Sequence, residues 1–229
     1  MLNLFIFLSH TLSCATINRL AFPSLVQQLL KNLGIASYNK ANSGPSLILR
    51  VGGNSAARVW WKSSTITPKL PGQTVLIEPF DLFILDYVAN ATNAKLILNL
   101  GMPTSTPVYA PDMINAYKTY ITPSNIYAIE VGNELDHAFK QGWRPASYSP
   151  QNYFTEYEAY STYVRQNMPG VDLMGPSYAY DWREAGYQIP FYDRFKDTTK
   201  YMSYHKYALR GCATVNTIDM LLDGTHFSN

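Results

Sequence analysis

The stretch YAIEVGNELDHA, residues 127–138, decides how the fold of this chain is interpreted. Its first half is a run of apolar and aromatic residues that is interrupted by Glu130 and ends at Gly132. A short continuous run of this kind is typical of a strand that is buried on both faces of a parallel sheet. Asn133 and Glu134 follow the glycine directly. The sequence therefore predicts a buried strand with an amide and a carboxylate side by side at its carboxyl end.

Strand and helix patterns alternate on both sides of this stretch. Apolar runs predict strands over residues 47–51, 95–101, 125–131, 171–175 and 201–205. Apolar residues at three-and-four spacing predict helices over 24–33, 79–91, 110–120, 151–167, 190–196 and 214–222. This alternation predicts βαβ crossovers and a parallel sheet in a single α/β domain.

Polar residues or turn-forming residues follow each predicted strand. They are Asn54 after a Gly-Gly pair, the segment 99–101, Asn133 with Glu134, the segment 175–178, and His205 after Tyr204. In a parallel barrel, the carboxyl ends of the strands converge on one mouth, where the active site lies. A doubly wound sheet also places its site beyond these ends. Either architecture predicts a functional site formed by these segments.

The composition narrows the class of ligand. The net charge is +2, and the 18 lysines and arginines are scattered without a basic run, which argues against nucleic acid. The chain carries no glycine-rich nucleotide motif and no metal-ligand spacing, so we predict no cofactor and no metal. After the first residues, no apolar run is long enough to span a membrane. The 18 tyrosines and 4 tryptophans suit a carbohydrate ligand, although tyrosine is also an ordinary core residue.

The first 16 residues have two interpretations. An apolar run over 2–8, followed by small residues at Ser13 and Ala15, resembles a secretory signal peptide, although no lysine or arginine precedes it. The alternative is a remnant of the first strand of the fold. In both cases the remaining domain spans residues 17–229. A signal peptide would make the protein secreted or extracellular, and the sequon at Asn90 would then be open to glycosylation.

The Asn133–Glu134 pair suits the hydrolysis of a glycosidic bond. This reaction commonly needs two carboxyl groups, one that protonates the leaving oxygen and one that attacks the anomeric carbon or activates water. A glutamate at a strand end can serve as the acid when a partly apolar surround raises its pKa. The preceding asparagine can hydrogen-bond the sugar 2-hydroxyl. The alternative is a pair that simply turns the chain into the next loop.

Three segments, LILRVGGNSA (47–56), EVGNELD (130–136) and SYHKYALRGC (203–212), occur in that order. Together they resemble glycoside hydrolase family 79, which contains β-glucuronidases and heparanase-like endo-glucuronidases. The resemblance implies a (β/α)8 barrel of the TIM-barrel type and a glucuronide or related glycan as substrate. It also implies that Glu134 is the general acid/base and that Asn133 contacts the 2-hydroxyl. Asn54 and His205 would then line the mouth of the barrel.

The chain departs from the family pattern in three respects. Leu135 stands where the family commonly has proline, and Ala57 stands near a position that is often acidic. In addition, the nucleophile of such barrels is a glutamate at the end of the seventh strand, whereas we count six strands here, the five apolar runs and the possible first strand. We therefore expect an incomplete barrel with about six βα units.

None of the other glutamates is a good candidate for the nucleophile. Glu130 lies inside the predicted strand, where we expect it to pair with an arginine such as Arg50. The rest lie on predicted helices or in a loop: Glu78, Glu156, Glu158 and Glu184. The sequence thus predicts a retaining-type glycoside hydrolase that is inactive or incomplete as it stands. A non-catalytic glycan-binding or regulatory homologue is the alternative.

Overall fold

A six-stranded parallel sheet forms the centre of the protein. The structure is a computed structural model that describes residues 5–7, 28, 32, 47–61 and 72–205. The strand order is β1-β2-β5-β6-β7-β8, so the strand that contains Glu130 is the fourth in the sheet. All five pairings are parallel. The strands are β1 (Phe5–Phe7), β2 (Leu47–Val51), β5 (Ala94–Leu100), β6 (Ile126–Val131), β7 (Leu173–Tyr178) and β8 (Tyr201–Tyr204).

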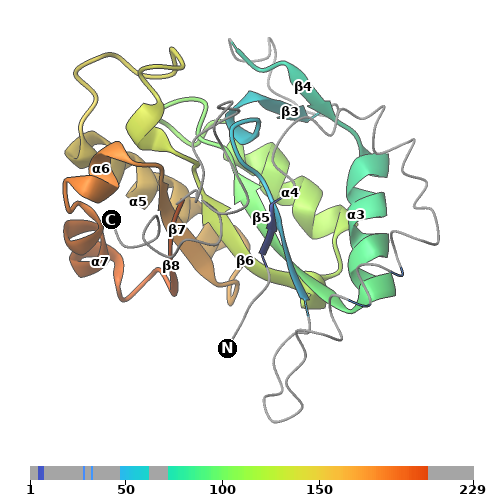
Figure 1. Cartoon of the computed structure of the whole chain (residues 1–229). Helices are drawn as coiled ribbons and strands as arrows, with labels where there is room; N and C mark the ends of the chain where they lie inside the picture. Colours follow the sequence, from blue (N-terminus) through green and yellow to red (C-terminus); the bar gives the residue numbers. More distant parts are fainter. Residues whose placement is uncertain (1–4, 8–27, 29–31, 33–46, 62–71, 206–229) are drawn as a thin grey trace, which may run out of the picture.

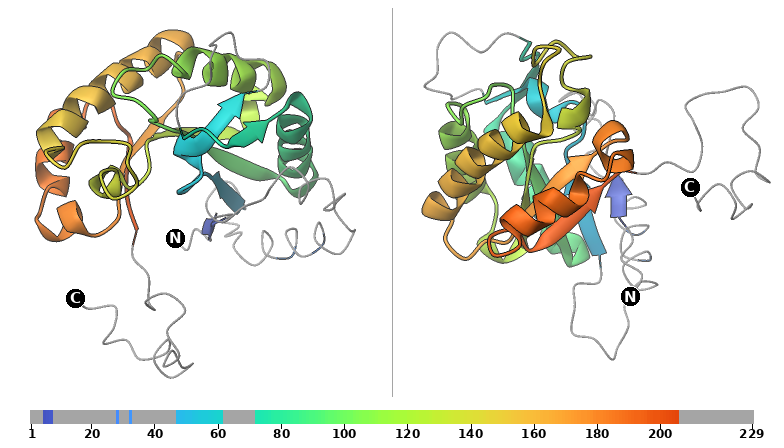
Figure 2. Two further views of the ribbon diagram at one scale, coloured as in Figure 1. Left: turned by 90° about the horizontal axis from the view of Figure 1, so that it is seen from above. Right: turned by 90° about the vertical axis from the view of Figure 1, so that its left-hand side faces the viewer.

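The connecting helices lie along the outer, convex side of the sheet (Figure 1). They are α3 (Pro79–Thr92), α4 (Ala110–Tyr120), α5 (Pro150–Asn167), α6 (Asp181–Glu184) and α7 (Gln188–Phe195). Short 3-10 turns occur at η1 (Ala56–Arg58), η2 (Pro123–Asn125) and η3 (Leu135–His137). Seen from above, the sheet curls into an arc with helices outside it (Figure 2). This half-barrel confirms the predicted incomplete α/β barrel.

Most predicted elements agree with the structure to within one or two residues. The clear difference is β7, which was expected to end at Gly175 but continues to Tyr178. Glycine and proline usually end a strand pattern, and here Pro176 follows Gly175. The glycine has a packing reason instead, because a Cβ at that position would lie 2.8 Å from the ring of Tyr157 on α5. The predicted helices over 24–33 and 214–222 lie outside the described residues.

A second, two-stranded parallel sheet was not expected from the sequence. It consists of β3 (Val59–Trp61) and β4 (Val75–Ile77), and runs of three residues carry too little periodicity to be recognised. The Trp61 side chain is buried in the main core, and its ring centroid lies 5.7 Å from that of Tyr120. Trp61 is therefore a packing residue. Within the described part of the chain, no helix has the length and apolar character needed to cross a membrane.

The inner face of the sheet changes from apolar to polar along the strands. Its apolar layer is a small cluster separate from the main core, formed by Ile48, Ile97, Ala128 and Met174. Closer to the carboxyl ends, the inner face carries Arg50, Asn99 and Glu130, all of them buried. Asn99 and Glu130 are register partners on β5 and β6, so their side chains share this face. The sheet therefore places a polar layer directly beneath its carboxyl edge.

Aromatic rings fill the space between α5, α7 and β7. Phe191 lies at the centre of this cluster, with ring centroids 4.8 Å from those of both Tyr157 and Phe195. Tyr153 and Tyr178 complete it at 6.1 and 6.2 Å from Phe191. Several of the tyrosines therefore serve the core rather than a ligand.

Replacing Phe191 by alanine is expected to destabilise the fold by about 3–5 kcal/mol, because it leaves a cavity among fixed rings. Its neighbour Tyr192 provides a matched control. Phe191 is 0% exposed and Tyr192 is 51% exposed, and the alanine variant at Tyr192 should change stability by less than about 0.5 kcal/mol. Urea denaturation of both variants measures the difference. Equal losses of stability would show that α7 is not packed as described.

Candidate active site

Glu134 lies directly beyond β6 in an unusual backbone conformation. Its φ is 49° and its ψ is 45°. This is the left-handed region, which residues other than glycine adopt at a cost of about 1–2 kcal/mol. The backbone N–H of Glu134 donates to the carbonyl of Ser177 (2.9 Å), and its own carbonyl accepts from the N–H of His137 (2.8 Å). These bonds hold the residue at the start of the turn η3, where 8% of it is exposed.

The departure at Leu135 fits this conformation. A proline at position 135 would restrict the preceding residue and favour extended backbone at Glu134. Leucine leaves Glu134 able to adopt the left-handed region, and the Leu135 side chain is itself buried in the main core. Leucine at position 135 is therefore compatible with the backbone conformation of Glu134.

Two hydrogen bonds orient the amide of Asn133. Its Oδ1 accepts from Nη2 of Arg50 (2.8 Å), and its Nδ2 donates to Oδ1 of Asn54 (3.1 Å). Arg50 belongs to β2, and Asn54 follows the Gly-Gly pair after that strand. The predicted site residues Asn54 and Asn133 are therefore in direct contact.

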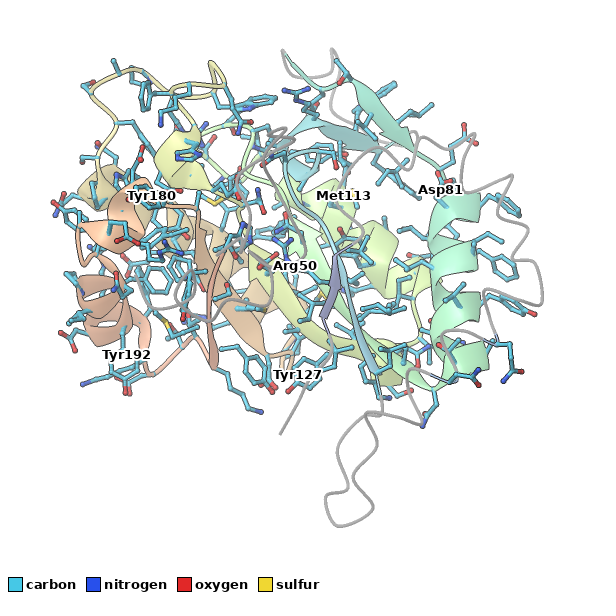
Figure 3. The ribbon with its side chains drawn as sticks, in the orientation of Figure 1. Arg50, Asp81, Met113, Tyr127, Tyr180 and Tyr192 are labelled. Atoms are coloured by element: carbon cyan, nitrogen blue, oxygen red, sulfur yellow. The ribbon has the colours of Figure 1, made fainter. Side chains whose placement is uncertain are left out.

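The predicted pairing of Glu130 with Arg50 is confirmed. Nε of Arg50 donates to Oε2 of Glu130 at 2.7 Å, and both residues are buried, at 3% and 0% exposure. The same carboxylate oxygen accepts from Nδ2 of Asn99 (2.7 Å), and the other oxygen accepts from Oγ of Ser177. Ser177 in turn shares a hydrogen bond of 2.8 Å with Ser203 on β8. One buried carboxylate therefore links side chains from five strands. In Figure 3, Arg50 lies at the centre, above Tyr127 at the amino-terminal end of β6.

His205 holds the carboxylate of Glu134 from the other end of the arc. Its Nδ1 lies 2.6 Å from Oε1 of Glu134, and both side chains are buried. The backbone on both sides of this histidine is fixed. Its N–H donates to the carbonyl of Tyr178 (2.7 Å), and its carbonyl accepts from Nη1 of Arg183 (2.8 Å). The structure therefore brings together all four predicted site residues, in two contacting pairs.

The electrostatic surroundings lower the pKa of Glu134. Burial of the carboxyl raises the pKa, but the hydrogen bond from His205 and the positive charges of His205, His137 and Arg50 lower it by more. This direction is opposite to the raised pKa that suits a general acid. Burial does raise the pKa of the carboxyl, but the effect of the neighbouring side chains on the pKa is larger.

The other described glutamates have structural partners. Glu156 forms a buried ion pair with Arg144 at 2.8 Å, and Glu78 caps the amino terminus of α3. The remaining two pair with arginines at the surface: Glu158 with Arg194 and Glu184 with Arg183. Among the described residues, then, none of these glutamates is placed as a nucleophile opposite Glu134. Across the residues that the structure describes, no group of three or more His, Cys, Asp or Glu side chains is arranged so that it could hold a metal ion.

A small pocket opens beside Glu134. Asn54, Asn133 and Glu134 line it together with Trp143 and Gln141 from the loop after η3. Ala57, which lies near the position where the resemblance suggests an acidic residue, is also part of its wall. Sequence reasoning did not single out Trp143, Gln141, Ser177 or Ser203. The one sequence feature that could have pointed to the loop after η3 is the tryptophan next to a glycine, Gly142–Trp143.

The fold is similar to that of AbfB, a family 51 alpha-L-arabinofuranosidase from Bifidobacterium longum. The TM-score is 0.56 at 16% sequence identity, over 88% of this chain and 42% of that chain. A monomeric beta-xylosidase from Caulobacter crescentus CB15 gives a TM-score of 0.49 at 16% identity, over 83% of this chain and 40% of that one. N2152 from Neocallimastix frontalis gives 0.43 at 15% identity, over 78% and 42%. No family model and no curated protein sequence matches the chain.

This chain therefore spans less than half the length of each of these structures. The likeness to AbfB shows a barrel fold of the kind found in that glycosidase. At 16% identity it does not extend to the substrate.

Replacing Arg50 by methionine is expected to destabilise the protein by about 3–5 kcal/mol, because Glu130 would be left buried and unpaired. Adding Glu130→Gln to this variant should restore part of the loss, since a neutral amide has a smaller desolvation penalty than a carboxylate. Urea denaturation is the measurement. Arg194→Met, which breaks an exposed pair, is the control and should cost less than about 1 kcal/mol. A double variant no more stable than Arg50→Met would contradict the ion-pair interpretation.

The carboxyl carbon of Glu134, followed by NMR, is expected to titrate below its ordinary pKa of 4.5. Because the pKa is lowered in the folded state, the ionised carboxylate stabilises the fold above pH 4.5. That stabilisation is lost as the pH falls through the folded-state pKa. In His205→Asn the midpoint should move upward, because burial remains while the hydrogen bond and the charge of His205 are gone. An unchanged midpoint in this variant would rule out His205 as the main cause.

Proposed function

We propose that this chain carries the acid/base half of a retaining glycoside hydrolase site. Glu134 is the general acid/base, and Asn133 binds the sugar 2-hydroxyl. The observation that carries the proposal is the position of Glu134 at the carboxyl end of β6, beside an amide that Arg50 and Asn54 hold in one orientation. The barrel-type fold shared with AbfB supports it.

Each proposed role follows from the contacts of the side chain. In the first step, protonated Glu134 gives its proton to the glycosidic oxygen while a second carboxylate attacks the anomeric carbon. In the second step, ionised Glu134 takes a proton from the water that releases the sugar. His205 fixes the carboxylate through Oε1, which leaves Oε2 for the substrate. The Asn133 amide, already oriented, can hydrogen-bond the 2-hydroxyl without further ordering.

The lowered pKa of Glu134 suits the base step better than the acid step. A nearby second carboxylate would raise the pKa, because two negative charges in one site disfavour each other. The neighbours that act on Glu134 among the described residues are His205, His137 and Arg50, which act in the other direction. We therefore propose that the chain alone has little or no hydrolytic activity. A non-catalytic glycan-binding homologue is the second candidate. It is favoured by the lack of a second carboxylate among the described residues that act on Glu134.

We propose a glucuronide or related glycan as the substrate class, on the strength of the three sequence segments around Arg50, Glu134 and His205. The secreted location that a signal peptide would give is also part of this proposal. The proposed substrate class and the proposed location do not depend on the acid/base role of Glu134, which can be tested separately.

The acid/base role can be tested by supplying azide ion as an external nucleophile. An aryl β-glucuronide with a poor leaving group is incubated with the 229-residue chain, with and without azide. We expect azide-dependent release of the phenol, in which azide displaces it from the anomeric carbon and Glu134 supplies the proton. Glu134→Gln should lower this release by about 100-fold or more. Glu158→Gln, an exposed glutamate on α5, is the matched control and should leave it unchanged.

The outcomes separate the candidates. Equal release by the chain and by Glu134→Gln would exclude the acid/base role. Binding of the glucuronide without any release would favour the glycan-binding alternative. Hydrolysis without azide that is lost in Glu134→Gln would support the role and contradict the proposed inactivity.

A further inference from the structure

A second, larger hollow adjoins the pocket beside Glu134. It lies between the β5–α4 loop, which contributes Pro103 and Ser105, and the β6–α5 loop, which contributes Trp143, Ser147 and Tyr148. Its volume of about 560 Å³ is in the range of small-molecule sites. Trp143 belongs to the walls of both hollows. The two spaces are therefore neighbours that share one indole ring.

The floor of this groove carries charges that cancel. Arg144 and Glu156 form a buried pair in which Nε and Nη2 of the arginine both donate to the carboxylate. The remaining donors of Arg144 reach backbone carbonyls, among them those of Pro103 (3.3 Å) and Met102 (3.1 Å). With its charge matched and its nitrogens bonded to the protein, Arg144 has little to offer a carboxylate or sulfate. An anionic ligand would enter a groove whose cation is already neutralised.

The walls of the groove are aromatic faces and small polar groups held in place. The Tyr148 hydroxyl donates to Glu156 (2.9 Å), and the guanidinium of Arg144 lies 5.5 Å from its ring centroid. The indole N–H of Trp143 donates to Gln141 (3.1 Å). The exposed side chains of Ser105, Ser147 and Asn152 complete the lining. Rigid rings beside hydroxyl and amide groups suit an uncharged ligand rich in hydroxyls.

The opposite wall is equally fixed. The Tyr160 hydroxyl donates to the carbonyls of Thr104 (3.2 Å) and Thr106 (2.9 Å), which ties the β5–α4 loop to α5. A Cβ at Gly72 would lie 2.7 Å from the Trp143 ring, so the backbone at Gly72 packs closely against the indole. The groove is therefore preformed, and a ligand that fits it is bound without a large ordering cost.

We propose that this groove binds a neutral saccharide unit on the leaving-group side of the glycosidic bond. The inference rests on the proposed function of Glu134. A general acid lies next to the oxygen of the leaving group, so the sugar that carries this oxygen is bound on the same side as the acid. The shared Trp143 then joins the two units of one glycan chain. The matched pair Arg144–Glu156 selects an uncharged sugar over a uronate or a sulfated sugar at this position.

The test uses defined oligosaccharides and needs no catalysis. Neutral probes are β-1,4-xylotetraose, cellotetraose and a β-1,3-linked galactotetraose, and anionic probes are tetragalacturonate and a heparin-derived tetrasaccharide. Affinity is measured by calorimetry, and the site is located by the indole N–H signal of Trp143 in NMR spectra, assigned with Trp143→Phe. We expect at least one neutral probe to bind and shift this signal. The anionic probes should bind about tenfold or more weakly.

Two tryptophan substitutions at exposed positions test the location. Ser147→Trp fills the groove and should weaken binding of the neutral probe by about tenfold or more. Thr119→Trp, at an exposed position on α4, is the matched control and should leave the affinity unchanged. Both variants are checked for an unchanged urea midpoint, and Ser105→Trp replaces Ser147→Trp if the latter is destabilised.

The results separate this inference from the function of Glu134. The inference is overturned if none of the neutral probes shifts the Trp143 signal, if Ser147→Trp binds as the control does, or if an anionic probe binds as tightly with the same shift. Azide-dependent release through Glu134 can persist in each of these cases. Conversely, saccharide binding in the groove can stand even when the Glu134→Gln variant releases phenol as well as the unaltered chain does.

Discussion

The buried pair of Arg50 and Glu130 is the interaction on which the rest of the site depends. Two opposite charges inside the arc of strands are tolerable only together, because either one alone would be buried without a partner. The same arginine reaches Asn133, so the group that neutralises the interior of the sheet also orients the amide beside the proposed acid. Asn99 and Ser177 extend the contact to the neighbouring strands. One guanidinium therefore both neutralises the buried carboxylate of Glu130 and orients the Asn133 amide at the carboxyl edge of the sheet.

Much of the fold could be read from the sequence, because long apolar runs and helical periodicity survive any tertiary context. The pairing of Glu130 was predictable for a related reason, since a carboxylate inside a buried strand requires a cation. The convergence of Asn54, Asn133, Glu134 and His205 followed from the geometry of parallel strands. The direction of the Glu134 pKa was not predictable. It depends on the placement of a histidine ring 71 residues away, which no local pattern encodes.

The groove beside Trp143 could not be predicted from the sequence, for a different reason. Its walls come from two loops without periodicity, and its charge balance arises from a pair, Arg144 and Glu156, that lie 12 residues apart on separate elements. The sequence displays an arginine and a glutamate, either of which suggests a charged surface. Their pairing in space gives a neutral floor instead. The two hollows thus differ, because the side chains around Glu134 lower the pKa of its carboxyl, whereas the charges of Arg144 and Glu156 in the groove balance each other.

The left-handed backbone of Glu134 has a consequence for the order in which the site forms. A single rotation to a relaxed conformation would relieve about 1–2 kcal/mol and swing the carboxylate out of the edge. What opposes this rotation includes the carbonyl of Ser177 on β7 and the ring of His205 beyond β8. Pairing of β6 with its neighbours is therefore not enough to place the Glu134 side chain, because the residue lies beyond the strand. Its position at this edge depends on contacts with residues that are distant in the sequence, Ser177 and His205.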